Sequence, residues 1–446
     1  MQAISLRYAA LPPESRAAFR QRVAAQHIDP ATLPIVPIAR SAASGGDAPL
    51  SFEQEHLWFL WKLQPDNPAY HMPGAIELDG EFDAAALDHA LGSVAQQHQS
   101  LCTRFFQRAD GELRQTTEGT PRPACRLHDL RGADGTALDA TLDAALRRAA
   151  VEPFDLEAGP PVRADLFRIG ASRYVLLLTL HHIVTDGHSM SVLIRALAQA
   201  YRQASSKAPA PTTAPTLQFR DCAAWQREWL DDAALQTHID YWRAQLGTHT
   251  PPSPLPFDRP RAHQPSAAGG RVRREIDAAL LAGLQTQAAA QGATLFMALL
   301  AAFGTLLYRY SSESDLRIGV PSSGRDSVET ENLIGFFVNT LVVRQQVAGN
   351  LPFGTLLAQT RQTLLDAQAH RALPFARLVR SLQTSRTDDT PLFHAMFSMQ
   401  RSDRAALLSL PGLSVTTREI ETGAAQFDLS FNVVEHDHGE IGRAHV

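Results

Sequence analysis

Apolar and polar positions alternate between strand-like and helix-like patterns along this chain. Residues 174–180, YVLLLTL, form an unbroken apolar run of strand length, which is typical of a strand covered on both faces. Between Met190 and Tyr201 the apolar residues recur at helical spacing, so we expect a helix soon after the strand. The polar stretch between them, HHIVTDGHS at 181–189, therefore joins the end of a buried strand to the start of a helix.

Similar patterns recur through the rest of the chain and predict an α/β fold in two halves. We predict helices at 13–27, 51–63, 82–101, 217–230, 233–246, 280–310 and 353–370. We predict strands at 74–80, 334–344, 393–400 and 427–435, and a strand followed by a turn at 315–325. Stretches rich in Pro, Gly, Ala, Ser or Thr at 41–50, 204–216 and 250–268 are expected to be loops, and the boundary between the halves falls within 204–268.

Length and composition narrow the class of protein. A chain of 446 residues, 44% of them hydrophobic and 20% charged, is expected to be globular with two packed domains. The 41 basic and 46 acidic residues give a net charge of −5, and the absence of a basic run argues against a nucleic-acid partner. The three cysteines are scattered, which argues against a disulfide framework and for a reducing compartment.

Membrane and export signals are also missing from the sequence. The longest apolar run, residues 295–307, is shorter than the roughly 20 residues that a membrane span needs, and we expect it to form a buried helix. The first residues have no apolar signal-peptide core. We therefore predict a cytoplasmic protein without a membrane partner.

The polar stretch at 181–189 allows three interpretations: a metal site, a surface turn, or a general base with its supports. A metal site would use His181, His182, Asp186 and His188. Neighbouring side chains on a strand point to opposite faces, so the two adjacent histidines cannot easily share one task, and this weakens the metal interpretation. A surface turn with incidental histidines remains possible because the chain has 17 of them.

The general-base interpretation assigns a role to each polar residue. A histidine exchanges protons near neutral pH, Asp186 would pair with an arginine, and the N–H of Gly187 would stabilise an oxyanion. No GxSxG motif or reactive-cysteine context accompanies the stretch. We therefore expect no covalent acyl-enzyme, and the nucleophile would come from a substrate.

The chain resembles a known family, the condensation domains of nonribosomal peptide synthetases, which are relatives of chloramphenicol acetyltransferase. HHIVTDG fits the HHxxxDG motif of that family. Other stretches resemble further blocks in the family's order: LSFEQEHLWFLWKL (50–63) for S-x-x-Q-x-x-L-W, QHQSLCTRF (97–105), FRDCAAWQ (219–226), IGFFVNTLVVR (334–344) for IGxFVNTxxxR, HRALPFARLV (370–379) and AQFDLSFNVVE (425–435). The matches extend from about 50 to 435, and together they are highly specific.

The resemblance implies two chloramphenicol-acetyltransferase-like lobes, a pseudo-dimer in a V with an active-site tunnel between them. We therefore expect an N-terminal helical segment and linker at 1–48, an N-terminal lobe at 49–225, an inter-lobe connection at 226–268 and a C-terminal lobe at 269–446. In relatives, a donor and an acceptor thioester enter on phosphopantetheine arms. The acceptor's α-amine then attacks the donor carbonyl to form an amide.

The resemblance also assigns residues. His182 would face the reacting centre, either as a base or as a group that orients the amine and stabilises the intermediate. His181 and Asp186 would be structural, and the arginine paired with Asp186 would be Arg325 or, as second choice, Arg344. For Asn339 and Trp225, packing and backbone support are the expected roles. No metal and no bound cofactor are implied.

The resemblance leaves the subtype open. Nothing before Met1 could carry a tethered donor, which favours a starter domain that N-acylates an aminoacyl carrier protein with a fatty acyl group from acyl-CoA. The alternative is an elongation domain that receives a peptidyl donor from another synthetase, with residues 1–40 as a docking segment. We expect a monomeric domain whose partners are downstream adenylation and carrier protein domains. Alternatives of other classes are a non-catalytic carrier-recruiting module, against which the presence of His182 counts, and a metal hydrolase.

Overall fold

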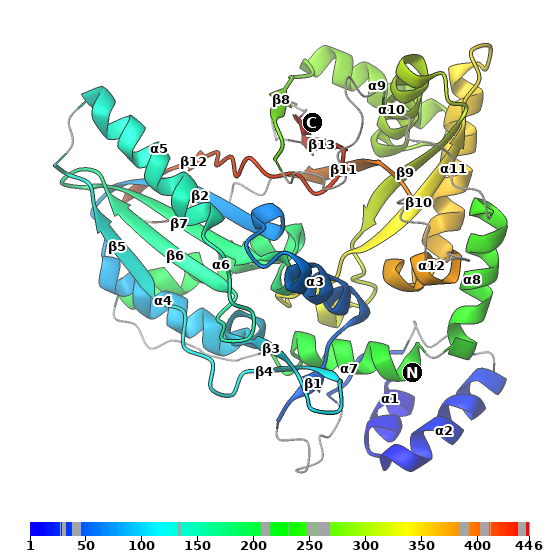
Figure 1. Ribbon diagram of the computed structural model, residues 1–446, viewed down its shortest axis with the longest axis horizontal. Coiled ribbons are helices and arrows are strands. Elements are labelled where there is room, and N and C mark those ends of the chain that lie inside the picture. The colour runs from blue at the N-terminus through cyan, green and yellow to red at the C-terminus, as the bar shows by residue number, and fades with distance from the viewer. Residues whose placement is uncertain are drawn as a thin grey trace. The chain divides into compact units, whose positions relative to one another are not determined.

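A computed structural model provides the structure of the chain (Figure 1). It describes residues 1–26, 28, 33–37, 46–132, 135–206, 215–230, 232–247, 255, 268–382, 392–401, 410, 412–435 and 443–445. Most of the loops expected at 41–50, 204–216 and 250–268 lie outside the described residues.

The chain divides into two compact units, neither of which is one continuous segment. Unit 1 comprises Met1–Asp231, Arg325–Phe337 and Asp403–Thr422, and unit 2 comprises Asp232–Gly324, Val338–Ser402 and Gly423–Val446. Two segments from the range expected to form the second lobe, 269–446, thus belong with the first half of the chain. They do so because Arg325 pairs with Asp186, and because strand β12 (Leu413–Arg418) pairs with β2 (His71–Gly80).

Unit 1 is built around a five-stranded sheet in the order β12-β2-β7-β6-β5. Its other strands are β5 (Cys125–Asp129), β6 (Val162–Arg168) and β7 (Arg173–His181); β5 and β6 are parallel, and the remaining pairs are antiparallel. Unit 1 also contains a three-stranded sheet in the order β1-β4-β3. Its strands are β1 (Ala48–Pro49), β3 (Arg104–Gln107) and β4 (Leu113–Thr116). The helices are α1 (Gln2–Ala9), α2 (Pro13–Ala25), α3 (Phe52–Leu63), α4 (Ala84–Gln97), α5 (Gly135–Val151), α6 (Gly187–Ser205) and α7 (Phe219–Trp229).

The central strand β7 is apolar from Val175 to Leu178 because helices cover both faces of the sheet (Figure 1). Leu176, Leu178 and Leu180 pack with α4 and α6 on one face, whereas Val175 and Leu177 pack with α5 on the other. Burying a side chain of this size stabilises the fold by about 1.5–3 kcal/mol. The strand therefore fixes the position of its carboxyl end, where the histidines follow.

The first two helices form a hairpin that packs on α7. Tyr8, fully buried, contacts Trp225 and Trp229 of α7, and its hydroxyl bonds to Glu228. Arg16 adds an ion pair to the same carboxylate, at 2.6 Å. Trp225 thus has the packing role that the sequence suggested for it.

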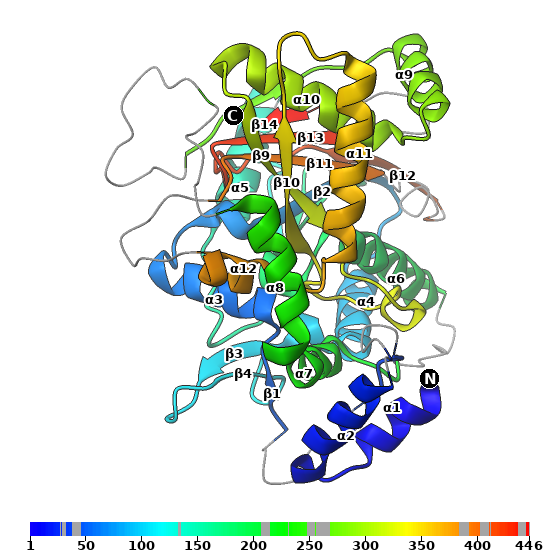
Figure 2. The same ribbon diagram turned by 90° about the vertical axis from the view of Figure 1, so that its right-hand side faces the viewer.

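Unit 2 is built around a six-stranded sheet in the order β10-β9-β11-β13-β14-β8. The strands are β8 (Arg271–Arg273), β9 (Asp315–Ser322), β10 (Asn339–Gln346), β11 (Ala395–Arg401), β13 (Leu429–Glu435) and β14 (Arg443–His445). The helices are α8 (Asp232–Leu246), α9 (Ala278–Ala290), α10 (Leu295–Ser311), α11 (Phe353–Ala369) and α12 (Phe375–Leu382). Residues of α9, α10 and α11 form the core with β9, β10 and β11, and Figure 2 shows α8 and α11 flanking the edge strand β10.

The predicted mixed α/β organisation is therefore confirmed, and the apolar run at 295–307 is the buried helix α10. No single described helix has both the length and the apolarity to cross a membrane. The α9–α10 pair has them jointly but is bent by 102° at its break.

Candidate functional site

The HHxxxDG stretch forms a tight corner between β7 and α6. The strand ends at His181, a short 3₁₀ helix covers His182–Val184, and α6 begins at Gly187. Asp186 caps the helix, because its carboxylate accepts the N–H of Ser189 at 2.7 Å. Asp186 takes the cap position because its backbone is extended and it immediately precedes the first helical residue.

His182 is partly exposed and held in one tautomer. Its Nδ1 lies 2.7 Å from the carbonyl oxygen of Thr185, which can only accept a hydrogen bond, so Nδ1 carries the proton. No described residue bonds to Nε2, which keeps its lone pair. Burial lowers the pKa of His182 below 6.5, against the opposing effects of the Thr185 bond and the Asp186 carboxylate. The imidazole is thus neutral at pH 7 and presents an acceptor.

The ring of His181 has different neighbours from that of His182. Its side chain is 3% exposed, its Nδ1 accepts the N–H of Ile183 at 3.2 Å, and its ring lies 6.1 Å from the rings of His71 and Phe154. Burial lowers its pKa well below 6.5. Among the described residues, no group of three or more His, Cys, Asp or Glu side chains is arranged to bind a metal ion.

Asp186 is the centre of a buried ion pair. Its carboxylate is bonded by the Arg325 guanidinium at 3.2 and 3.4 Å and by the N–H of Phe337 at 3.1 Å. The side chains of Asp186 and Arg325 are 2% and 4% exposed, so removing either partner would leave a buried charge uncompensated. Burial lowers the pKa of Arg325, and Asp186 opposes that effect. The Arg325 guanidinium also donates to the carbonyl of Leu333 at 3.0 Å.

Two other residues assigned from the resemblance belong to unit 2. Arg344 pairs with Asp315 at 2.7 Å and donates to the carbonyl of Gln245 at 2.9 Å, so the second-choice partner for Asp186 has a different carboxylate. Asn339 organises the start of α12. Both therefore act on the backbone of their own unit.

Gly187 and His188 begin α6 and are both exposed. The N–H of Gly187 is one of the first-turn amides that lack a helical acceptor, and no described residue accepts it. His188 Nε2 donates to the carbonyl of Glu331 at 2.8 Å, which ties it to the segment 325–337 rather than to His182.

Two supports of the corner were missed in the sequence. Ser51 and Gln54 form a capping box at the start of α3, and Gln54 Nε2 also donates to the carbonyl of Ile183 at 3.1 Å. Ser189 Oγ donates to the carbonyl of Gly335 at 2.8 Å and accepts the N–H of Gly335 at 3.1 Å. The S-x-x-Q spacing was a usable signal for the capping box. Nothing local to Ser189 signals a partner 146 residues away.

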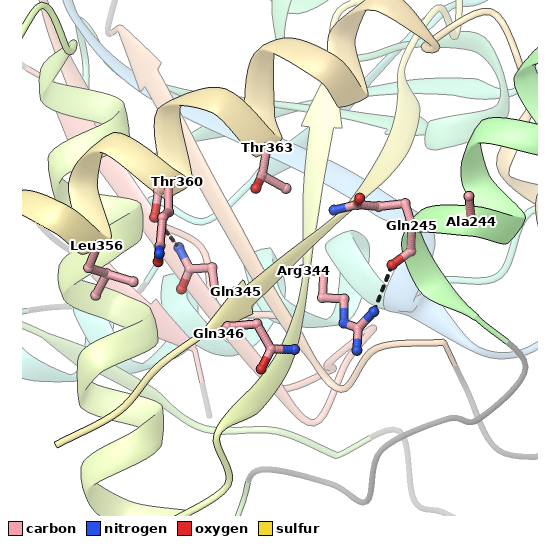
Figure 3. A pocket seen from close by; sticks show the side chains of 9 residues that line it. Ala244, Gln245, Arg344, Gln345, Gln346, Leu356, Thr360 and Thr363 are labelled. Carbon is pink, nitrogen blue, oxygen red and sulfur yellow. Dashed lines mark hydrogen bonds between the residues drawn. The ribbon is translucent and has the colours of Figure 1, made fainter. Parts of the chain in front are cut away.

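A separate cavity of about 340 Å³ lies in unit 2, between α8, β10 and α11 (Figure 3). Its lining is polar and includes Gln245, Arg344, Gln346, Gln359, Thr360 and Thr363. Of the residues assigned from the sequence, it contains Arg344, whose guanidinium is already committed to Asp315.

Comparison with known proteins decides the family. The family model described as "Condensation domain" matches residues 44–442. The chain is a condensation domain. The phosphinothricin tripeptide synthetase PhsC of Streptomyces viridochromogenes is 37% identical over 98% of this condensation domain, which spans 40% of PhsC and about 5% of some other curated relatives.

Solved structures share the fold. The X-domain from teicoplanin biosynthesis is 27% identical, with a TM-score of 0.80 over 92% of this chain and 91% of its own. The starter condensation domain of the rhizomide synthetase RzmA, an R148A mutant in complex with C8-CoA, is 21% identical. It gives a TM-score of 0.77 over 91% of this chain and 90% of its own. These likenesses confirm the chloramphenicol-acetyltransferase-like lobes expected of a condensation domain.

Proposed function

We propose that this condensation domain joins two thioesters by an amide bond, with His182 at the reacting centre. The observation that carries the proposal is the fixed tautomer of His182: Nδ1–H is tied to Thr185, and Nε2 is left as an acceptor. An acceptor of this kind suits the N–H of an attacking amine. Condensation domains form amide bonds in nonribosomal peptide synthetases, so the reaction class is an acyltransferase.

The chemistry balances without a cofactor. The α-amine of the acceptor attacks the donor's thioester carbonyl, a C–N bond forms, and the C–S bond then breaks to release a thiol. A free α-ammonium has a pKa near 8, above that of His182, but its nitrogen becomes more acidic once bonded to the carbonyl carbon. Nε2 would therefore take the proton at the tetrahedral stage and pass it to the leaving sulfur, while the N–H of Gly187 would face the oxyanion.

Two donors are candidates. The starter reaction takes a fatty acyl group from acyl-CoA, and its support is the shared fold with the RzmA starter domain. The elongation reaction takes an acyl or peptidyl group from a carrier protein, and its support is the higher identity to a tripeptide synthetase. For either donor we propose an aminoacyl group on a carrier protein's phosphopantetheine as the acceptor, an adenylation domain as the further partner, and a cytoplasmic setting.

The experiment offers each donor separately to the domain together with an aminoacyl-loaded carrier protein, and weighs the carrier by intact mass spectrometry. A mass gain of one acyl group, lost in His182→Ala, is the expected result. His89→Ala is the matched control, because His89 is an exposed histidine of the same unit. Transfer from octanoyl-CoA supports the starter reaction, and transfer only from a carrier-bound donor supports elongation. Carrier binding without transfer from either donor would overturn the proposal in favour of a recruiting module.

A further inference from the structure

Phe336 lies directly against His182. The two ring centroids are 4.8 Å apart, and the rings meet at 64°, edge to face. Phe336 is partly buried and packs against the apolar cluster that includes Ile183 and Val184, the two residues that follow His182. It occupies the position that the IGxFVNTxxxR block leaves open. The Phe336 ring thus touches the imidazole on which the proposed function depends.

The backbone on both sides of Phe336 is fixed by side chains from the α6 corner. Before it, the main chain of Gly335 makes two bonds with the Ser189 hydroxyl, at 2.8 and 3.1 Å. After it, the N–H of Phe337 donates to Asp186 at 3.1 Å. The approach is close, since a Cβ on Gly335 would lie 2.0 Å from the ring of Phe219. The main chain on either side of Phe336 is therefore bonded to the corner.

All hydrogen-bonding sites of the Ser189 hydroxyl are occupied. Its hydroxyl donates to the carbonyl of Gly335 and accepts both the N–H of Gly335 and the Arg325 guanidinium, the latter at 2.7 Å. A hydroxyl has one donor and two acceptor sites, so no capacity is left. Because Ser189 is completely buried, a substitution without a hydroxyl leaves these partners unpaired.

The charged and titratable groups around His182 are few. Asp186 favours the imidazolium, and Arg325, from the segment 325–337, pairs with that carboxylate. His181 is adjacent and itself held neutral by burial. From α3, the group that contacts the corner is the uncharged amide of Gln54. Burial, to which the ring of Phe336 contributes, is the main influence that lowers the pKa of His182.

We propose that Phe336 is a positioning residue for His182: its ring, fixed through Ser189, holds the imidazole in place and shields it from water. The two side chains together keep His182 oriented and neutral, ready to accept a hydrogen bond. The expected effect of Phe336 on the rate of amide formation rests on the proposed function. Its expected effect on the titration of His182 does not.

The test is the titration of His182 in the full chain, followed by NMR of ¹⁵N-labelled histidine and assigned through His182→Gln. In Phe336→Ala the imidazolium becomes hydrated, so the pKa of His182 rises towards 6.5, and Ser189→Ala shifts it in the same direction. Phe336→Leu keeps an apolar cover and shifts it less. Phe353→Ala, which removes a 44% exposed ring at the start of α11, leaves it unchanged.

The rate of amide formation gives the second reading. A rise of one unit in the pKa of His182 lowers the rate in the acidic limb about tenfold and leaves the plateau at high pH in place. A merely structural role would lower the rate equally at every pH. An unchanged titration in folded Phe336→Leu, Phe336→Ala and Ser189→Ala overturns the proposal. If the variants shift the titration of His182 as expected but the unsubstituted domain transfers no acyl group, the proposed function is refuted and the positioning role of Phe336 stands.

Discussion

At the scale of single residues, Gly187 offers a backbone group whose removal can be tested cleanly. It is the first helical residue of α6, it has no positive φ, and Asp186 before it is extended, with φ −135° and ψ −179°. Proline is tolerated at the first position of a helix and requires an extended residue before it. A proline at this position therefore removes the N–H without disturbing the corner.

We expect Gly187→Pro to lower turnover by about 10²–10³-fold, the usual loss when one oxyanion donor is removed. Gly187→Ala keeps the N–H and serves as the control. The measurement is kcat for carrier acylation, with circular dichroism to check the fold. Equal turnover in the two variants would show that Gly187 donates nothing to the oxyanion.

A second residue-scale prediction concerns stability in acid. Burial lowers the pKa of His98, which is 6% exposed, from 6.5 to about 4. Between those values the unfolded chain binds a proton that the folded chain does not. The free energy of unfolding therefore falls as the pH drops below 6.5 and is recovered in full above it.

Replacing His98 by Leu should reduce the slope of the unfolding free energy against pH by up to about 1.4 kcal/mol per unit between pH 6.5 and 4. Urea titrations at several pH values measure that slope. His89→Leu, at an exposed position of helix α4, which His98 follows directly, is the comparison, and it should change the slope less than His98→Leu does. A slope that is the same in both variants would contradict the prediction.

At the scale of elements, Asn339 connects β10 to α12. Its Nδ2 donates to the carbonyls of Arg371 and Leu373, both at 2.8 Å, and its Oδ1 accepts the N–H of Phe375 at 2.9 Å. One buried amide thus shapes the turn that leads into α12. A carboxylate has the same shape but no donors.

Asn339→Asp should therefore destabilise unit 2 by at least about 2 kcal/mol, because two carbonyl oxygens lose their donors and face a buried negative charge. Asn350→Asp makes the same chemical change at an exposed turn and should have little effect. Denaturant unfolding of the two variants gives the comparison. Equal midpoints would mean that α12 does not depend on this amide.

The elements also show what the sequence could reveal. Strand β7 and helix α6 were predictable because their apolar periodicity is local and covers whole elements. The strand predicted at 334–344 was wrong in its first half: β10 begins at Asn339, because the main chain of Gly335 and Phe337 bonds to Ser189 and Asp186 instead of to a neighbouring strand. A local pattern contains no information about partners more than a hundred residues away.

At the scale of the whole molecule, unit 1 depends on two segments that come late in the chain. Arg325–Phe337 supplies the partner of a buried carboxylate, and β12 covers the edge of β2. Without them, β2 would present an open edge and Asp186 an uncompensated charge. We therefore expect that the first half of the sequence is not an independent folding unit.

Residues 1–231, produced alone, should not fold cooperatively. We expect weak near-ultraviolet circular dichroism and concentration-dependent association, whereas the full chain shows a sharp thermal transition. Adding a peptide of residues 403–422 should reduce the association, because the peptide restores the strand next to β2. A fragment that melts as sharply as the full chain would refute this dependence.

Because β12 comes late in the sequence, unit 1 cannot be completed until most of the chain has been synthesised. The ribosome must add roughly 190 residues between the end of the first part of unit 1, at 231, and the end of its last part, at 422. At about 5–20 residues per second this takes roughly 10–40 s, far longer than most domains need to fold. During that interval the nascent chain has an unpaired strand edge, so a chaperone that shields β2 would act on this protein while it is still being made.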